Sequence, residues 1–166
     1  MHTPNDTRLE IGKVITNLQA LEFALRLFLY ELQKTDSNQQ NQSFDLQSLS
    51  VGDWVLETPI TNYDTLAQVI KKVNAELRDR GFSDLVDPSV VKLRDAIAHG
   101  RIASLRLNGP FSICKFSKPL NGKVKVSFAV EMTKNWFEQQ IVHTFGEMKK
   151  VIKSARDLGL TCFPDG

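Results

Sequence analysis

Four stretches of the chain repeat their apolar residues at intervals of three and four, the period of an amphipathic α-helix. The first follows Thr7 and Glu10, which have the spacing of a capping box. The third follows Asp87 and Pro88, a pair that favours a helix start. A short helix plus irregular chain is expected within residues 44–57. The four long helices are predicted over residues 8–34, 62–80, 88–99 and 134–158. The pattern therefore predicts a mainly α fold, a helical bundle of four to five helices.

A period close to two replaces the helical one between residues 111 and 130. Val124, Val126, Phe128 and Val130 alternate there with lysines and small residues, after a turn over residues 119–122. The sequence therefore predicts a β-hairpin inserted into the helical fold near residues 111–130.

The first predicted helix is apolar on nearly all sides from Leu18 onward. Such a helix has to be covered on more than one face, and a second subunit is one source of that cover. Residues 1–6 are expected to be a short flexible N-terminus. The uniformly polar run 35–43 is expected to be an exposed loop.

The composition is that of an ordinary globular domain, with 166 residues, 42% hydrophobic and 24% charged. We therefore expect a single domain over residues 1–166. Cys114 and Cys162 are far apart and lack a ligand cluster, which favours a reducing compartment and no metal site. Neither a signal peptide nor an uncharged stretch of membrane-spanning length is visible, so a cytoplasmic protein without a membrane partner is expected.

Charge is distributed unevenly along the chain, although the net charge is only +2. Residues 1–90 carry 8 basic and 13 acidic side chains, whereas residues 91–134 carry 9 basic and 2 acidic ones. A concentrated basic stretch favours an anionic partner, with nucleic acid as the first candidate. A solvated face, balanced by the acidic N-terminal half, is the alternative.

The segment Arg94-Asp95-Ala96-Ile97-Ala98-His99-Gly100 combines a histidine with cationic side chains where a helix is expected to end. Asp95 and His99 are four residues apart, so the carboxylate can accept a hydrogen bond from the imidazole. Arg94 offers a planar fork that suits phosphate oxygens. Capping of the helix end is the alternative role of His99. His143 lies within the last predicted helix, where a solvated position or pairing with another helix is its expected role.

A histidine that exchanges a proton beside an arginine that holds a phosphate is the minimum set of groups for RNA cleavage without a metal. A base removes the proton from the 2′-hydroxyl, the oxygen attacks the adjacent phosphate, and cations stabilise the developing charge. Arg94 and His99 are five residues apart, about 140° around an ideal helix, so they do not share one face. Either the last turn distorts at Gly100, or a second subunit completes the site across a two-fold axis.

This segment resembles the signature motif of the HEPN superfamily, in which a short spacer separates an Arg from a His and a polar residue often follows the Arg. The stretch from Leu18 to Arg26 resembles the first long helix of these domains. The resemblance covers residues 8–158 and implies a HEPN-like helical bundle that is a metal-independent endoribonuclease of single-stranded RNA, without a cofactor. It also implies a toxin–antitoxin or phage-defence setting, a homodimer with a composite site at its interface, and a cognate antitoxin as partner.

Carried over residue by residue, the resemblance makes Arg94 and His99 the catalytic pair and Asp95 the residue that orients them. Glu22 is an accessory candidate, and a salt bridge to Arg26 is its alternative use. The side chains expected to contact the RNA backbone are Arg101, Arg106, Lys115, Lys118, Lys123 and Lys125.

Two further hypotheses compete with the enzyme. One is a non-catalytic HEPN-like dimerisation module that binds RNA or a protein, and the other is a helical dimerisation protein whose basic stretch only faces solvent. Glycine-rich phosphate loops, His-Glu-x-x-His and Cys-x-x-Cys spacings do not occur in the sequence, so other catalytic classes find little support.

Overall fold

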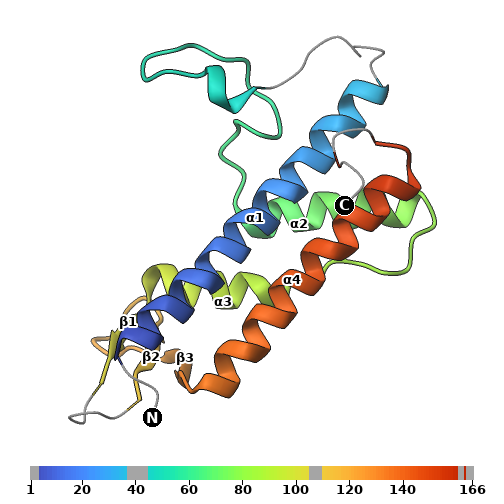
Figure 1. Ribbon diagram of the computed structural model, residues 1–166. Helices are drawn as coiled ribbons and strands as arrows, with labels where there is room; N and C mark the ends of the chain where they lie inside the picture. The colour runs from blue at the N-terminus through green and yellow to red at the C-terminus, as the bar shows by residue number, and fades with distance from the viewer. Residues whose placement is uncertain (1–3, 37–44, 105–109, 161–162, 164–166) are drawn as a thin grey trace. The chain divides into compact units, whose positions relative to one another are not determined.

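We describe a computed structural model of the chain over residues 4–36, 45–104, 110–160 and 163 (Figure 1). These residues form a mainly helical protein with a small three-stranded antiparallel sheet. The helices are α1 (Pro4–Asp36), η1, a 3-10 turn (Leu46–Ser48), α2 (Leu66–Asp79), α3 (Ser89–His99) and α4 (Lys134–Asp157). The strands are β1 (Arg101–Ala103), β2 (Ser112–Phe116) and β3 (Val126–Glu131), in the order β1-β2-β3. The prediction of a mainly helical protein is confirmed.

The start of α1 differs from the prediction. The helix begins at Pro4, because proline tolerates the first helical position and Asp6 places a negative charge in the first turn. Thr7 therefore lies inside the helix and is buried, so the capping box predicted from Thr7 and Glu10 is wrong. The flexible N-terminus expected over residues 1–6 is likewise wrong from Pro4 onward.

The segment after α1 also departs from the expectation. Thr35 and Asp36 extend the helix, and the remainder of the polar loop expected over 35–43 lies outside the described residues. The short helix expected within 44–57 is the single turn of η1, and the irregular chain expected after it continues to Asp64.

The chain divides into two compact units, and α1 and α4 each contribute to both. Unit 1 comprises residues 1–21 and 87–147, and unit 2 comprises residues 22–86 and 148–166. The core of unit 1 includes the fully buried Phe137 and Ile113. The core of unit 2 includes Phe28, Ile70 and Leu77, which are equally buried. The prediction of one domain stays a prediction.

Within unit 1, α1 and α4 lie side by side (Figure 1), and the Asn17 amide reaches the Thr144 hydroxyl at 3.4 Å. The α3 helix packs against β2, whose Ile113 is 0% exposed. The predicted hairpin is confirmed as β2 and β3, joined by a turn in which Asn121 and Gly122 have φ of 50° and 73°. Two consecutive residues with positive φ are typical of the tight turns that match the twist of a hairpin.

The sheet contains two features that the alternating pattern did not predict. The first is β1, which follows directly on α3 and pairs Arg101 with Cys114. The second is a register shift between Lys115 and Phe116, which pairs Phe116 with Val126. The shift inserts Ser127 as an extra residue, so Val126 leaves the face of Phe128 and is 51% exposed.

Candidate active site at the end of α3

The RDAIAHG segment forms the second half of α3 and the connection to β1. The helix stays regular up to His99, and the Gly100 amide donates to the Ala96 carbonyl at 2.6 Å. Gly100 itself is extended, with φ −76° and ψ 164°, and leads into the strand. A Cβ at this position would lie 2.9 Å from Cγ1 of Ile113, so glycine is required by the close approach of β2.

The regular last turn excludes the first of the two alternatives for Arg94 and His99, a distortion of the helix end. The helix does not distort at Gly100, so the two side chains leave it about 140° apart. Both are accessible: the Arg94 side chain is 42% exposed, and His99 is exposed at the end of the helix. Ala96, in contrast, is fully buried, so only Ala98 offers a small side chain at the surface.

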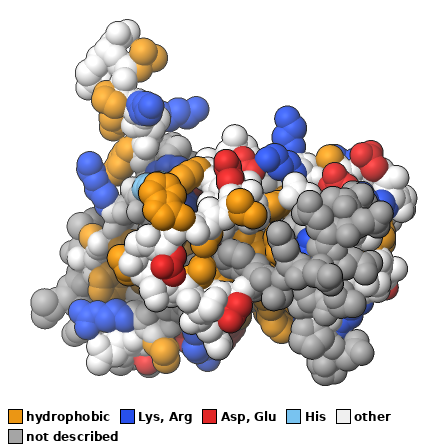
Figure 2. All heavy atoms as spheres, turned by 90° about the horizontal axis from the view of Figure 1, so that it is seen from above, with side chains coloured by type: hydrophobic (Ala, Val, Ile, Leu, Met, Phe, Trp, Pro, Cys, Tyr) orange, Lys and Arg blue, Asp and Glu red, His pale blue; other side chains and the backbone are white. Residues whose placement is uncertain are grey.

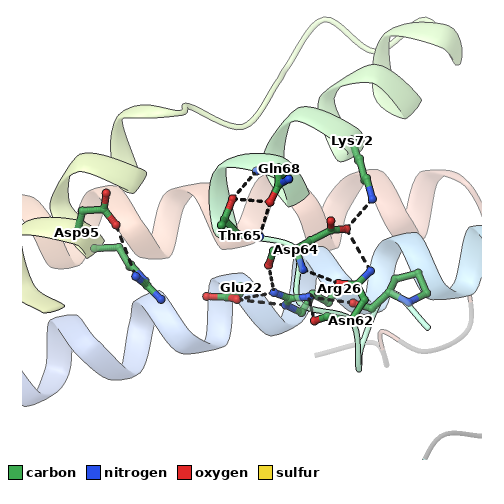
Figure 3. A network of polar contacts seen from close by, with 10 residues as sticks. Glu22, Arg26, Asn62, Asp64, Thr65, Gln68, Lys72 and Asp95 are labelled. Atoms are coloured by element: carbon green, nitrogen blue, oxygen red, sulfur yellow. Dashed lines mark hydrogen bonds and ion pairs between the residues drawn. The ribbon is translucent and has the colours of Figure 1, made fainter. Parts of the chain in front are cut away.

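Asp95 is held by two cations. Its carboxylate lies 3.5 Å from Nη1 of Arg94 and 3.3 Å from Nζ of Lys115, which reaches it from β2. Figure 3 shows Asp95 in its contact with the arginine. Among the described residues no hydrogen bond joins Asp95 to His99, because the carboxylate is turned toward these two cations instead. Asp95 thus orients Arg94 and Lys115 rather than the imidazole.

Arg101 is a further basic side chain of this region and lies on the opposite face of the sheet from Lys115. Its guanidinium carbon lies 5.2 Å from the centre of the Phe116 ring, within the range of a cation–π contact. Arg101 is exposed and Phe116 is half-buried, so the stacked pair faces solvent. The residues Arg94, Asp95, His99, Arg101 and Lys115 are called the motif surface below.

The remaining basic candidates lie beyond the motif surface. Lys118, Lys123 and Lys125 are exposed on the hairpin between β2 and β3. Figure 2 shows a narrow projection on which basic and hydrophobic side chains gather. The segment from Phe116 to Val126 has this composition. Arg106 lies outside the described residues.

Glu22 belongs to unit 2, and its carboxylate accepts two bonds from Arg26. The Oε1 atom lies 2.8 Å from Nη2 and 3.1 Å from Nε. Figure 3 shows the two side chains in this contact. The other donors of Arg26 reach carbonyl oxygens of Pro59, Asn62 and Asp64. The salt bridge anticipated as the alternative use of Glu22 is confirmed.

A polar cluster around His143 was not predicted. The ring Nε2 lies 3.2 Å from Oγ of Ser89 and 3.6 Å from Oδ2 of Asp87, at the start of α3. Glu147, one turn further along α4 and almost fully buried, accepts from the Asp87 amide at 2.8 Å. The spacing of His143 and Glu147 was the available signal. The cluster joins α4 to the start of α3, the helix-pairing role expected of His143.

The described ranges contain neither a candidate metal site nor a candidate membrane span. Within these ranges, no three or more His, Cys, Asp or Glu side chains are grouped so as to hold a metal ion. None of the described helices combines the length and the apolar character needed to cross a membrane. Cys114 is a half-buried free thiol, and Cys162 lies outside the described residues.

Comparison with protein-family models, with curated proteins and with solved structures finds no match to this chain.

Proposed function

We propose that this protein is a metal-independent endoribonuclease of the HEPN type that cleaves single-stranded RNA. The observation that carries the proposal is the motif surface, where an accessible arginine and an accessible histidine lie on the second half of one helix. Two cations, Arg94 and Lys115, contact the single carboxylate of Asp95 there, and Arg101 adds a third positive charge on the opposite face of the sheet. A surface with this excess of positive charge is suited to hold a phosphodiester.

Each side chain has a defined task in this proposal. His99 accepts the proton of the 2′-hydroxyl, and the resulting oxygen attacks the adjacent phosphorus. The bond from phosphorus to the 5′ oxygen breaks, this oxygen takes up a proton, and a 2′,3′-cyclic phosphate remains. Arg94, held in place by Asp95, stabilises the negative charge that develops on the phosphate oxygens.

The 140° between Arg94 and His99 favours a site shared between two subunits. In a two-fold dimer, Arg94 of one subunit faces His99 of the other, so neither side chain has to reach around its own helix. Leu9 and Ile15 are exposed apolar side chains of α1, at 61% and 36%, that a second subunit would cover. The resemblance of the RDAIAHG segment to the HEPN motif also leads us to propose a role in toxin–antitoxin or phage defence, with a cognate antitoxin as partner.

One observation favours a second candidate function, a non-catalytic module that binds RNA or a protein. No described side chain donates to or accepts from His99, so nothing within the described chain fixes its tautomer. Arg101 stacked on Phe116 is equally suited to bind RNA without cleaving it.

Cleavage of a labelled single-stranded RNA in EDTA separates the two candidates. We expect the parent protein to leave 2′,3′-cyclic phosphate ends, and His99→Ala to lower the rate by about 10²- to 10⁴-fold. Arg94→Lys is also expected to impair cleavage, because a point charge does not replace a planar fork.

His143→Ala is the matched control, because it removes the other described histidine without touching the motif surface. It is expected to cleave at a rate close to that of the parent. RNA binding without cleavage in the parent would favour the binding module, and parental cleavage by His99→Ala would refute the assignment of the site.

A further inference from the structure

Unit 2 exposes an unusual amount of apolar surface between η1 and α2. Trp54 and Tyr63 are fully exposed, at 100% and 101%, and Val51 and Leu56 are largely so. The two aromatic side chains alone present roughly 300–500 Å² of surface. Large apolar side chains exposed together on one short segment favour an interaction site near it.

This segment is also acidic and ends at a pocket. Residues 45–64 carry Asp45, Asp53, Glu57 and Asp64, and no Lys, Arg or His. The pocket, of about 510 Å³, is formed in unit 2 by the end of the segment together with α1 and α2. Its apolar lining comes from Leu29, Leu32, Pro59 and Ala75, and its acidic lining from Glu57, Asp64 and Glu76.

Two of these carboxylates already have basic partners, one of which also lines the pocket. Lys72 lies 2.5 Å from Asp64, and Arg80 pairs with Glu76. Lys72 is also the only basic side chain among the described residues that line the pocket, as Figure 3 shows for its contact with Asp64. Glu57 is exposed at the mouth. The pocket therefore suits an occupant with an apolar tip and positive charges beside it.

The hairpin between β2 and β3 combines an apolar tip with positive charges beside it. Leu120, at the turn, is 76% exposed, and Val124 beside it is 52% exposed. Lys118, Lys123 and Lys125 are exposed on the same short segment, which contains no acidic residue from Phe116 to Val126. A tight turn also projects its side chains with little loss of conformational entropy, because its backbone is already fixed.

We infer that the hairpin of one copy docks in the acidic, apolar pocket of a second copy. Leu120 enters between Leu29, Leu32 and Ala75, while the hairpin lysines lie against Glu57 and the acidic segment before it. The apolar tip supplies most of the binding free energy, and the opposite charges set the orientation and the salt dependence. This contact does not depend on the ribonuclease activity.

The two surfaces can be changed separately, which gives a complementation test by analytical ultracentrifugation. Leu120→Ser on the hairpin and Glu57→Lys on the pocket are both exposed positions, so each variant is expected to fold. We expect Leu120→Ser to weaken self-association about tenfold or more and Glu57→Lys by a smaller factor. Val142→Ser, an equally exposed apolar change on α4, is the control and should leave association unchanged.

Mixing then tests complementarity directly. Lys123→Glu and Glu57→Lys should each associate weakly alone and more tightly when mixed, because the mixture pairs opposite charges across copies. If Leu120→Ser associates like the parent, or if the mixture gains nothing over the single variants, the inference is overturned.

A photo-crosslinker placed at position 120 identifies the occupant. With isotopically light and heavy copies mixed, we expect crosslinks from position 120 of one copy to the 29–33, 57–64 or 72–76 segments of the other. Crosslinks confined to a single chain, or crosslinks to other surfaces only, would overturn docking on a second copy.

Discussion

Arg26 in unit 2 and Arg94 in unit 1 are the same side chain in opposite situations. Every nitrogen of the Arg26 guanidinium donates to an oxygen within unit 2, and its side chain is only 12% exposed. Within the described part of the chain Arg94 has one polar contact, at 3.5 Å to the neighbouring Asp95, and its side chain is 42% exposed. A guanidinium has five N–H donors, so Arg94 keeps most of its hydrogen-bonding capacity for another molecule.

The two arginines differ because one is needed to hold the fold together and the other is not. The irregular chain around Asn62 has few backbone bonds of its own, and Arg26 replaces them by binding its carbonyl oxygens. The end of α3 is fixed by backbone packing at Gly100 instead, so its cations are not needed to hold the structure. A charge that the fold does not use is the better candidate for function.

The largest effect expected from this comparison is on stability. Arg26→Ala should lower the free energy of unfolding by about 3 kcal/mol, because Glu22 and several carbonyl oxygens lose their partner in a half-buried site. Arg94→Ala is the matched control, and as a surface change it should cost no more than about 0.5 kcal/mol. Urea unfolding of both variants measures the difference, and equal losses would contradict the comparison.

Gly100→Ala tests whether backbone packing fixes the motif surface. The new Cβ would meet Ile113 and the Ala96 carbonyl, so the variant should be less stable than the parent by about 1–3 kcal/mol. Gly146→Ala on α4, where the Cβ meets nothing within 4 Å, is the control for the chemical change alone. Thermal unfolding gives the comparison, and a Gly100→Ala protein as stable as the parent would refute the close approach.

Alanine at Lys118, Lys123 and Lys125 addresses the basic hairpin. If all three contact phosphates, RNA binding should weaken for every sequence, and the slope of log affinity against log salt should fall by roughly 0.7 per lysine. Lys149→Ala, Lys150→Ala and Lys153→Ala on α4 form a control of equal charge change. Fluorescence anisotropy at several salt concentrations measures both slopes, and an unchanged slope in the hairpin variant would exclude these contacts.

The smallest effect expected is electrostatic and lies in unit 2. The hydrogen bond from Lys72 is the main cause that holds the pKa of Asp64 below its usual range. The contact therefore stabilises the fold above the ordinary carboxyl pKa of about 3.9 and is lost as the pH falls through the lowered value. Lys72→Ala should raise the pKa of Asp64 in an NMR titration, whereas Lys71→Ala, at an exposed neighbour, should not.

The sequence was sufficient for the parts of the fold that local patterns determine. The long helices, the hairpin and the pairing of Glu22 with Arg26 all depend on residues a few positions apart. The start of α1 at Pro4 was not predicted, because a threonine such as Thr7 can mark a helix start or lie buried inside a helix, as it does here.

The features that the sequence did not predict depend on contacts between residues far apart in the chain. A three-residue strand such as β1 has no period to detect, and it exists because β2 lies beside it. The partner of Asp95, Lys115, lies 20 residues further along the chain, so the sequence favoured the nearer His99. The bulge at Ser127 likewise depends on pairing with β2 and moved Val126 to the exposed face.

The most direct test of the central claim, that Arg94 and His99 act together across two subunits, is cleavage by mixed variants in EDTA. Arg94→Ala and His99→Ala should each be inactive alone. When they are mixed and allowed to exchange subunits, half of the dimers should hold one intact site, so about a quarter of the parental activity should return. Exchange without any recovery of cleavage would contradict the shared site.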